Sequence, residues 1–185
     1  MSVSSGDSDG ALATRSIAGD NRAFAELVTR YKQFLYGLTV RLVGNPDDAL
    51  ELVQEAFVAA HGALRNYDAS RPMRTWLARI AVNKARDWQR KERVRAVLRN
   101  VLPIGEVPDI AANQASVEQT VIDRAELAQV RQRIARLPIR LREVLVMRTI
   151  EGLPQAEVAE MLGISEKAVE TRLYRARRRL ESPSG

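Results

Sequence analysis

The sequence predicts an all-α protein made of two helical domains that a flexible linker joins. Apolar residues recur at three- and four-residue steps over most of the chain, which is the spacing of one face of an α-helix. Pro103, Gly105 and Pro108 interrupt this pattern between Asn100 and Ser116. A structureless stretch of this length is unusual inside one compact domain, so we expect one domain on each side of it. The expected boundaries are 1–10 for a disordered N-terminus, 11–99 for the first domain, 100–116 for the linker, 117–181 for the second domain and 182–185 for a tail.

The first domain should contain four helices. A short helix is expected over 11–18, and Asp20 can cap a long helix that ends at Gly44. Asn45 followed by Pro46 is a strong start for the third helix, because asparagine caps a helix and proline suits its first position. The fourth helix should follow the loop 66–73 and run from Arg74 to about Arg99.

The third helix has an apolar side and an acidic side. The acidic side carries Asp48, Glu51, Gln54 and Glu55, with Val58 among them. An acidic face on a basic protein is either an ordinary solvated surface or a docking face for a basic protein partner. The sequence pattern alone leaves both readings open.

The fourth helix carries a basic stripe beside aromatic side chains. Residues 74–99 hold nine Lys or Arg against two acids, a net charge of +7. Cations that hold phosphates and rings that stack on bases are what an unpaired nucleic-acid strand requires. Trp76 lies next to Leu77 and is more typical of a core residue, whereas Trp88 fits either role.

The last third of the chain has the pattern of two short helices joined by a tight turn. After Leu153-Pro154, apolar residues at helical spacing run to Gly163, which can adopt the left-handed conformation that ends a helix. Ser165 can cap a second helix that should reach about Glu181. This arrangement predicts a helix-turn-helix unit.

The second helix of this unit has two chemically different faces. Its apolar stripe is formed by Val169, Leu173, Ala176 and Leu180. The opposite face suits a DNA groove, where side chains near the helix start reach base edges and later cations neutralise phosphates. An ordinary solvated C-terminal helix is the alternative. The face consists of Lys167, Thr171, Tyr174 and Arg178, flanked by Glu170 and Arg175.

Composition limits the chemistry that the chain can perform. The 185 residues carry a net charge of +6 and no cysteine, so disulfides and thiolate metal sites are excluded. No apolar run is long enough to cross a membrane and no signal-peptide pattern is present, so we expect a cytoplasmic protein without membrane insertion. His61 is the single histidine, and no glycine-rich phosphate loop occurs. We therefore expect a protein that is not an enzyme and that binds no metal or cofactor.

Three blocks of the chain resemble, in the same order, segments of the extracytoplasmic-function (ECF) group of bacterial sigma factors of the sigma-70 family. Residues 48–57 resemble region 2.2, and residues 74–87 resemble regions 2.3 and 2.4. The third block, from Leu137-Pro138 to Arg177, resembles region 4. Together they cover most of residues 20–180.

The resemblance implies a role for each predicted surface. A sigma factor binds core RNA polymerase, directs it to promoters and assists promoter melting, in this group often in a stress response. The acidic face would dock on the clamp helices of the β′ subunit, and the second domain would meet the β flap. An anti-sigma factor is a further implied partner. The implied polymerase-binding residues are Asp48, Glu51, Gln54 and Glu55.

Promoter DNA would be contacted by both domains. The loop 66–73 and the basic helix would hold the unwound strand of the minus-ten element, with a base turned out of the stack. The helix-turn-helix would read the minus-thirty-five element in the major groove. The implied minus-ten residues are Tyr67, Arg71, Arg74, Trp76, Arg79, Asn83, Arg86 and Arg90. The implied minus-thirty-five residues are Ser165, Lys167, Glu170, Thr171, Arg172, Tyr174, Arg175 and Arg178.

One departure from the family and two rival functions bear on these assignments. Glu170 stands where the family often has a basic residue, and its carboxylate could accept from cytosine N4 or orient a neighbouring arginine. A stand-alone helix-turn-helix regulator would bind duplex DNA without polymerase. A nucleic-acid enzyme would require a carboxylate cluster with a metal ion.

Overall fold

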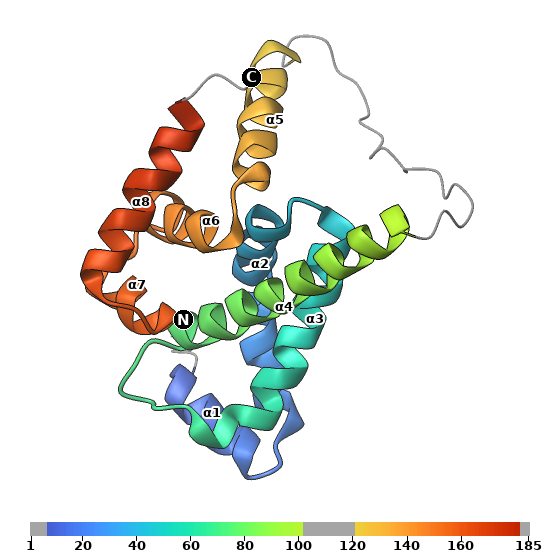
Figure 1. The fold of residues 1–185 in the computed structure, drawn as a ribbon. Coiled ribbons are helices and arrows are strands. Elements are labelled where there is room, and N and C mark those ends of the chain that lie inside the picture. The colour runs from blue at the N-terminus through green and yellow to red at the C-terminus, as the bar shows by residue number, and fades with distance from the viewer. Residues whose placement is uncertain (1–6, 102–120, 182–185) are drawn as a thin grey trace.

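The structure is a computed structural model that describes residues 7–101 and 121–181, and in these two ranges every regular element is helical (Figure 1). The first range contains α1 (Asp9–Ile17), α2 (Asn21–Val43), α3 (Pro46–Ala63), the short 3₁₀ turn η1 (Leu64–Asn66) and α4 (Met73–Val101). The second range contains α5 (Val121–Arg136), α6 (Ile139–Leu145), the π-helical turn η2 (Val146–Ile150), α7 (Gln155–Leu162) and α8 (Glu166–Glu181). The all-α prediction is confirmed.

The N-terminal helix starts earlier than the sequence pattern indicates. Residues 1–10 were expected to be disordered, but α1 begins at Asp9, and the Ser8 side chain caps it by accepting a hydrogen bond from the Ala11 amide at 3.2 Å. The expected disorder is therefore wrong for residues 9 and 10, while residues 1–6 lie outside the described ranges. Because Ser8 satisfies one of the free amides at the helix start, the short helix can form.

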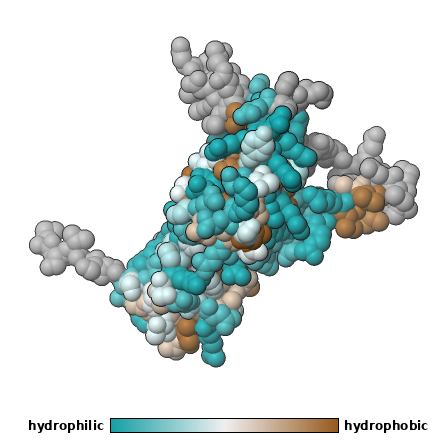
Figure 2. All heavy atoms as spheres, turned by 60° about the vertical axis from the view of Figure 1, so that its left-hand side comes forward, coloured by the Kyte–Doolittle hydropathy of each residue, from teal (hydrophilic) through white to brown (hydrophobic). Residues whose placement is uncertain are grey.

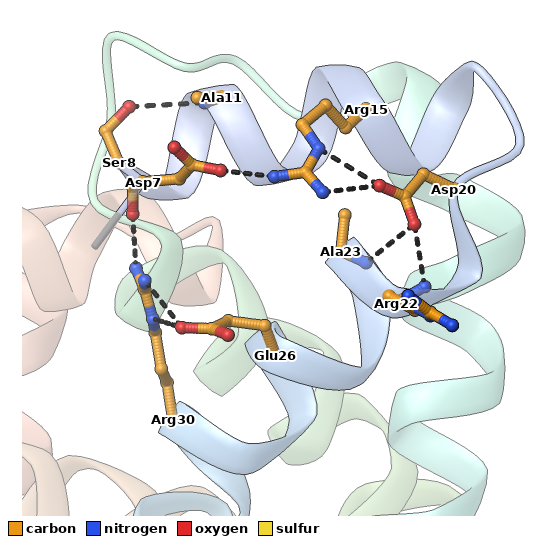
Figure 3. A network of polar contacts seen from close by, with 9 residues as sticks. All are labelled: Asp7, Ser8, Ala11, Arg15, Asp20, Arg22, Ala23, Glu26 and Arg30. Carbon is orange, nitrogen blue, oxygen red and sulfur yellow. Dashed lines mark hydrogen bonds and ion pairs between the residues drawn. The ribbon is translucent and has the colours of Figure 1, made fainter. Parts of the chain in front are cut away.

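A polar network fixes α1 against α2 (Figure 3). Arg15 binds the carboxylates of Asp7 and Asp20, the latter at 2.6 Å, and Asp20 also caps α2. Arg30 donates to the Asp7 carbonyl at 2.7 Å. The hydrogen bond from Arg15 is the main cause that lowers the pKa of Asp20 below its ordinary value. The network thus joins the start of α1 to the first three turns of α2.

The core of the first domain lies where α2, α3 and α4 meet. Leu35, Leu38 and Leu42 of α2 are completely buried, and small residues such as Ala56 and Ala85 let α3 and α4 approach closely. Full burial of one leucine side chain contributes about 1.5–3 kcal/mol relative to leaving it in water. Gly44 then ends α2 in the left-handed conformation, with φ of 85°.

The second domain forms around the packing of α6 and α7 against α8. Val144, Val158 and Val169 are fully buried there. Gly163 ends α7 with φ of 64°, and Ser165 accepts from the Ala168 amide at 3.2 Å at the start of α8. This geometry confirms the predicted helix-turn-helix. The π-helical turn η2 was not predicted, because a wider turn leaves no signal in residue spacing.

The two domains pack against each other instead of standing apart. The first four turns of α4 lie against α7 and α6, and α2 touches α5, α6 and η2 (Figure 1). Arg142 of α6 is buried and donates to the carbonyls of Leu42 in α2 and Leu137, the latter at 2.8 Å. Burial lowers the pKa of Arg142 to about 10, so this guanidinium is still charged at neutral pH. The predicted linker lies outside the described residues, except that α4 continues to residue 101.

Candidate polymerase and promoter surfaces

The acidic face of α3 is open to solvent. Asn45 caps the helix by accepting from the Asp47 amide at 2.8 Å, which fixes the first turn from which Asp48 projects. Glu51 and Gln54 are exposed, and Glu55 is half-buried beside Lys84 of α4 at 3.0 Å. The structure therefore brings all four predicted polymerase-binding residues onto one accessible helix face.

Two apolar side chains accompany these acids. Val58 is 74% exposed and Leu50 is 54% exposed, although both are large hydrophobic residues. Sequence reasoning placed Val58 on this face but gave it no role, and it missed Leu50. Large apolar side chains that stand beside polar groups on a surface are typical of a protein–protein contact.

Part of the predicted minus-ten set surrounds a pocket. Tyr67, Arg71, Trp76 and Arg79 line a cavity of about 480 Å³, and the α7 residues Glu157, Glu160 and Met161 form its other wall. The rings of Tyr67 and Trp76 lie 5.3 Å apart at 53°. Burial, the main cause, raises the pKa of the Tyr67 hydroxyl, which stays protonated and donates to the Arg71 carbonyl at 2.7 Å. Trp76 is half-buried, packs against the core and also lines the pocket.

The loop that carries this pocket rests on α1. A Cβ atom on Gly10 would lie 3.2 Å from the Cβ of Ala69, which is closer than side chains normally pack. Asp68 shapes the same loop by accepting from the Ser70 amide at 2.9 Å. Sequence reasoning missed this support because it assigned Gly10 to a disordered tail.

The remaining minus-ten residues divide into paired and open positions. Arg74 lies over the ring of Phe34 at 4.2 Å and binds Glu151 at 2.8 Å. Arg86 forms two hydrogen bonds of 2.7 Å with Glu143. Asn83 and Arg90 are exposed, and Arg90 contacts Asp87 on its own helix at 2.5 Å. Two of the predicted DNA-binding cations, Arg74 and Arg86, thus form ion pairs with carboxylates of the second domain.

The outer face of α8 is accessible over most of its length. Tyr174 is 61% exposed, and Lys167, Arg175 and Arg178 are also exposed. Glu170 binds Lys167 at 2.8 Å, so the partner of this carboxylate is a lysine and not an arginine. Ser165 serves as the helix cap, and Thr171 donates to the Lys167 carbonyl at 2.8 Å.

Arg172 differs from the rest of this predicted set. Its side chain is 20% exposed and points toward Glu143 at 3.4 Å. Glu143 is completely buried, and its hydrogen bonds are the main cause that raises the pKa of Arg86. Sequence reasoning used Glu143 only as part of a motif and missed its buried role.

The described residues contain no sign of metal chemistry or of a membrane span. Across residues 7–101 and 121–181, no group of three or more His, Asp or Glu side chains could hold a metal ion. In the same ranges, no helix is long and apolar enough to cross a bilayer.

Comparisons with known families match both halves of the chain. The family Sigma-70 region 2 matches residues 27–95, and Sigma-70, region 4 matches residues 127–180. The first match contains α3 and most of α4, and the second contains the helix-turn-helix. Both halves are therefore those of a transcription initiation factor.

Relatives that match over nearly the full length define the family more closely. The chain is 41% identical to the RNA polymerase sigma factor CnrH of Cupriavidus metallidurans, over 95% of this chain and 94% of that protein. It is 33% identical to the ECF RNA polymerase sigma factor SigW of Bacillus subtilis, over 88% and 89% of the two chains. The solved structure of CnrH in complex with the cytosolic domain of CnrY superposes with a TM-score of 0.66 at 35% identity, covering 94% of this chain and 95% of that one. The chain belongs to the ECF sigma factors of the sigma-70 family.

Proposed function

We propose that the acidic face of α3 is the surface by which this sigma factor binds core RNA polymerase. Four polar residues and the exposed Val58 share one helix face that is largely exposed, with Lys84 of α4 beside Glu55 at its edge. This open, mixed face is the observation that carries the assignment, since a basic and partly apolar partner surface complements it. The partner would be the clamp helices of the β′ subunit.

The pocket between Tyr67 and Trp76 would receive a base of the minus-ten element. A base that leaves the stack costs a few kcal/mol, which stacking on an aromatic ring and a cationic border can offset. Arg71 and Arg79 stand at the border of the pocket. Further along α4, Asn83, Arg86 and Arg90 would follow the phosphates of the same strand.

The outer face of α8 would read the minus-thirty-five element. Its first two turns carry Lys167 and Glu170, which would meet base edges, while Arg175 and Arg178 would neutralise phosphates or contact bases. In this role the second domain would also contact the β flap. The protein would act in the cytoplasm, where core polymerase is, and it would supply binding energy and no catalytic group.

A protein inhibitor is the further partner that we propose. The related CnrH has been solved bound to the cytosolic domain of CnrY. Exposed apolar residues such as Leu50 and Val58 would be available to an inhibitor as well as to polymerase.

Transcription by core polymerase with and without this protein tests the proposal, with a gel shift of the protein alone on the same promoter DNA. Specific initiation that requires both components, with little shift by the protein alone, is expected. A tight shift by the protein alone without a gain in transcription would instead indicate a stand-alone regulator.

A further inference from the structure

The start of α8 carries an acid on a face that is otherwise suited to DNA. Glu170 is exposed and lies on the same outer face as the exposed Lys167 and Tyr174. A carboxylate on this face repels the phosphates of a duplex, so it weakens binding that depends on charge alone. A hydrogen-bond donor on the DNA can offset this cost, and in the major groove the base edges supply such donors.

A lysine stands beside this carboxylate. The Lys167 Nζ lies 2.8 Å from a carboxylate oxygen of Glu170, and the two side chains are 81% and 59% exposed. Residues three positions apart are neighbours on a helix surface, so the two side chains project together. We refer to Lys167 and Glu170 as the lysine–glutamate pair. It presents a donor and an acceptor side by side at the end of the helix that reaches base edges in helix-turn-helix proteins.

The backbone that carries the lysine–glutamate pair is fixed by its surroundings. Ser165 accepts a backbone amide at 3.2 Å as the cap of α8, and Gln155 of α7 donates to the Glu166 carbonyl at 3.2 Å. The neighbouring Thr171 donates its hydroxyl to the Lys167 carbonyl at 2.8 Å, so this hydroxyl is already used within the helix. The pair therefore stands on a firm support, as a group that selects one base pair requires.

One base pair presents the matching order of acceptor and donor in the major groove. A guanine–cytosine pair places the guanine acceptors N7 and O6 next to the cytosine donor N4. O6 and N4 are hydrogen-bonded to each other and thus lie about 2.9 Å apart, close to the separation of the two side-chain tips. Lys167 can donate to N7 or O6 while Glu170 accepts from N4. An ammonium has three donors and a carboxylate about four acceptor sites, so the ion pair does not have to break.

The other base pairs match this order less well. A thymine–adenine pair offers O4 to the lysine, but a methyl group replaces the second acceptor, and the adenine N7 directs a lone pair toward the carboxylate. Cytosine–guanine and adenine–thymine pairs set a donor against Lys167 and an acceptor against Glu170. Two donors or two acceptors that face each other lose their hydrogen bonds to water without gaining a partner, which costs binding energy.

We propose that the lysine–glutamate pair reads one guanine–cytosine base pair of the minus-thirty-five element, with the guanine on the side of Lys167. This inference rests on the proposed role of α8 and adds the base pair that the helix selects. An exposed ion pair within one helix contributes little to stability, so the fold does not depend on either side chain. Both residues can therefore be changed without disturbing α8.

Transcription from a pool of randomised templates tests this assignment with the full-length protein and core RNA polymerase. Each template carries a random upstream region and a barcode that is copied into RNA, so that sequencing of the transcripts gives the base preference at every upstream position. The first variant is Glu170→Gln, and the second exchanges the two residues, Lys167→Glu with Glu170→Lys. The control Glu181→Gln makes the same charge change as the first variant, at the other end of α8.

Glu170→Gln should change the preference at one position of the upstream motif from guanine–cytosine toward thymine–adenine, because an amide side chain pairs with adenine N6 and N7. The ratio of the two base pairs at that position should shift roughly tenfold. The exchanged variant keeps the net charge but reverses donor and acceptor, so it should favour cytosine–guanine there. Glu181→Gln should leave this position unchanged, and the minus-ten motif should be the same for all the proteins.

The outcomes separate this inference from the proposed function. If the wild type selects an upstream motif and both variants leave every position unchanged, the base-pair assignment is wrong while the proposed role of α8 stands. An equal loss at all upstream positions, or the same change with Glu181→Gln, would also overturn the assignment, because the pair would then contact phosphates or act through net charge. If the wild type directs no transcription from any template, the proposed function itself fails.

Discussion

The two long faces of the first domain carry opposite charge and have opposite accessibility. The acidic face of α3 is largely exposed: Lys84 of α4 contacts Glu55 at its edge, while Glu51 and Val58 extend into solvent. The basic side of the neighbouring α4 is covered over its first four turns, where Arg74 and Arg86 form ion pairs with Glu151 and Glu143 of the second domain. Figure 2 shows the side of the molecule that carries α7 and α8 as largely hydrophilic, with hydrophobic side chains in small groups.

The difference between the faces implies an order of events. A surface that is open in the free protein can meet its partner first, while a surface that pairs internally must first lose its internal partners. If the acidic face binds polymerase as proposed, it can do so in the compact state, whereas Arg74 and Arg86 on the basic face would first have to lose their glutamate partners. The four predictions that follow test this difference, from the largest expected effect to the smallest.

Reversing the charge on the acidic face of α3 should have the largest effect, a loss of affinity for core polymerase. Glu51→Arg with Glu55→Arg places two cations where a basic partner is expected, so affinity for core polymerase should fall about 100-fold, because like charges across an interface cost several kcal/mol. A pull-down with purified core measures the loss, and circular dichroism confirms the fold. Glu26→Arg with Glu181→Arg is the charge-matched control. If both double variants lost the same affinity for core polymerase, the acidic face would not be the docking surface.

Replacing the buried carboxylate of Glu143 should have the next largest effect, a loss of stability. Glu143→Gln leaves Arg86 and Arg172 without a counter-charge at the domain contact, and the free energy of unfolding should fall by roughly 2 kcal/mol. Urea denaturation at neutral pH measures it. Glu160→Gln, at the exposed border of the same contact, should cost less than about 1 kcal/mol. Similar losses for the two variants would contradict the expectation that the buried ion pair contributes more than the exposed one.

The outer face of α8 extends the comparison to the second domain, because this face is exposed although the two domains are packed together. Arg175→Ala should weaken promoter binding by the polymerase holoenzyme about tenfold if the side chain reads a base. A promoter with a scrambled minus-thirty-five element is the control template. A loss of the same size on that template would mean that Arg175 contacts a phosphate.

Disturbing the contact between α1 and the loop 66–73 should have the smallest effect. Gly10→Ala adds a methyl group that meets Ala69, and the shift of the loop should lower open-complex formation by about threefold, with little change in polymerase affinity. Permanganate reactivity of unpaired thymines measures opening. Gly10→Ala combined with Ala69→Gly restores the space and should restore opening, whereas a defect that persists would place the cause in α1 alone.

The individual helices could be predicted because their signals are local. Asp20, Asn45 and Ser165 each cap the helix that the sequence assigned to them, and Gly44 and Gly163 end helices in left-handed conformations. Hydrophobic spacing placed Val169 and Ala176 on the buried side of α8. These features depend on neighbours within about four residues, which the sequence displays directly.

The contact between the domains could not be predicted because its signals are distant. Glu151 and Arg41 are paired across 110 positions, and in the sequence each alone is an ordinary charged residue. Arg172 looked like another cation of the DNA face, and only the fold shows that it turns toward Glu143. The assignments to polymerase and promoter remain predictions, since side chains that share a face do not by themselves identify their partner.

The buried Arg142 should couple the thermal unfolding of the two domains. Its guanidinium donates to the Leu42 carbonyl in the last turn of α2, a group that helix geometry leaves without an intrahelical partner. It also donates to the carbonyls of Ala135 in the last turn of α5 and of Leu137 before α6. The end of a helix in one half of the chain is thus completed by a side chain from the other half. Heat should therefore disorder both halves together, in a single calorimetric transition whose enthalpy matches the whole described fold rather than either half.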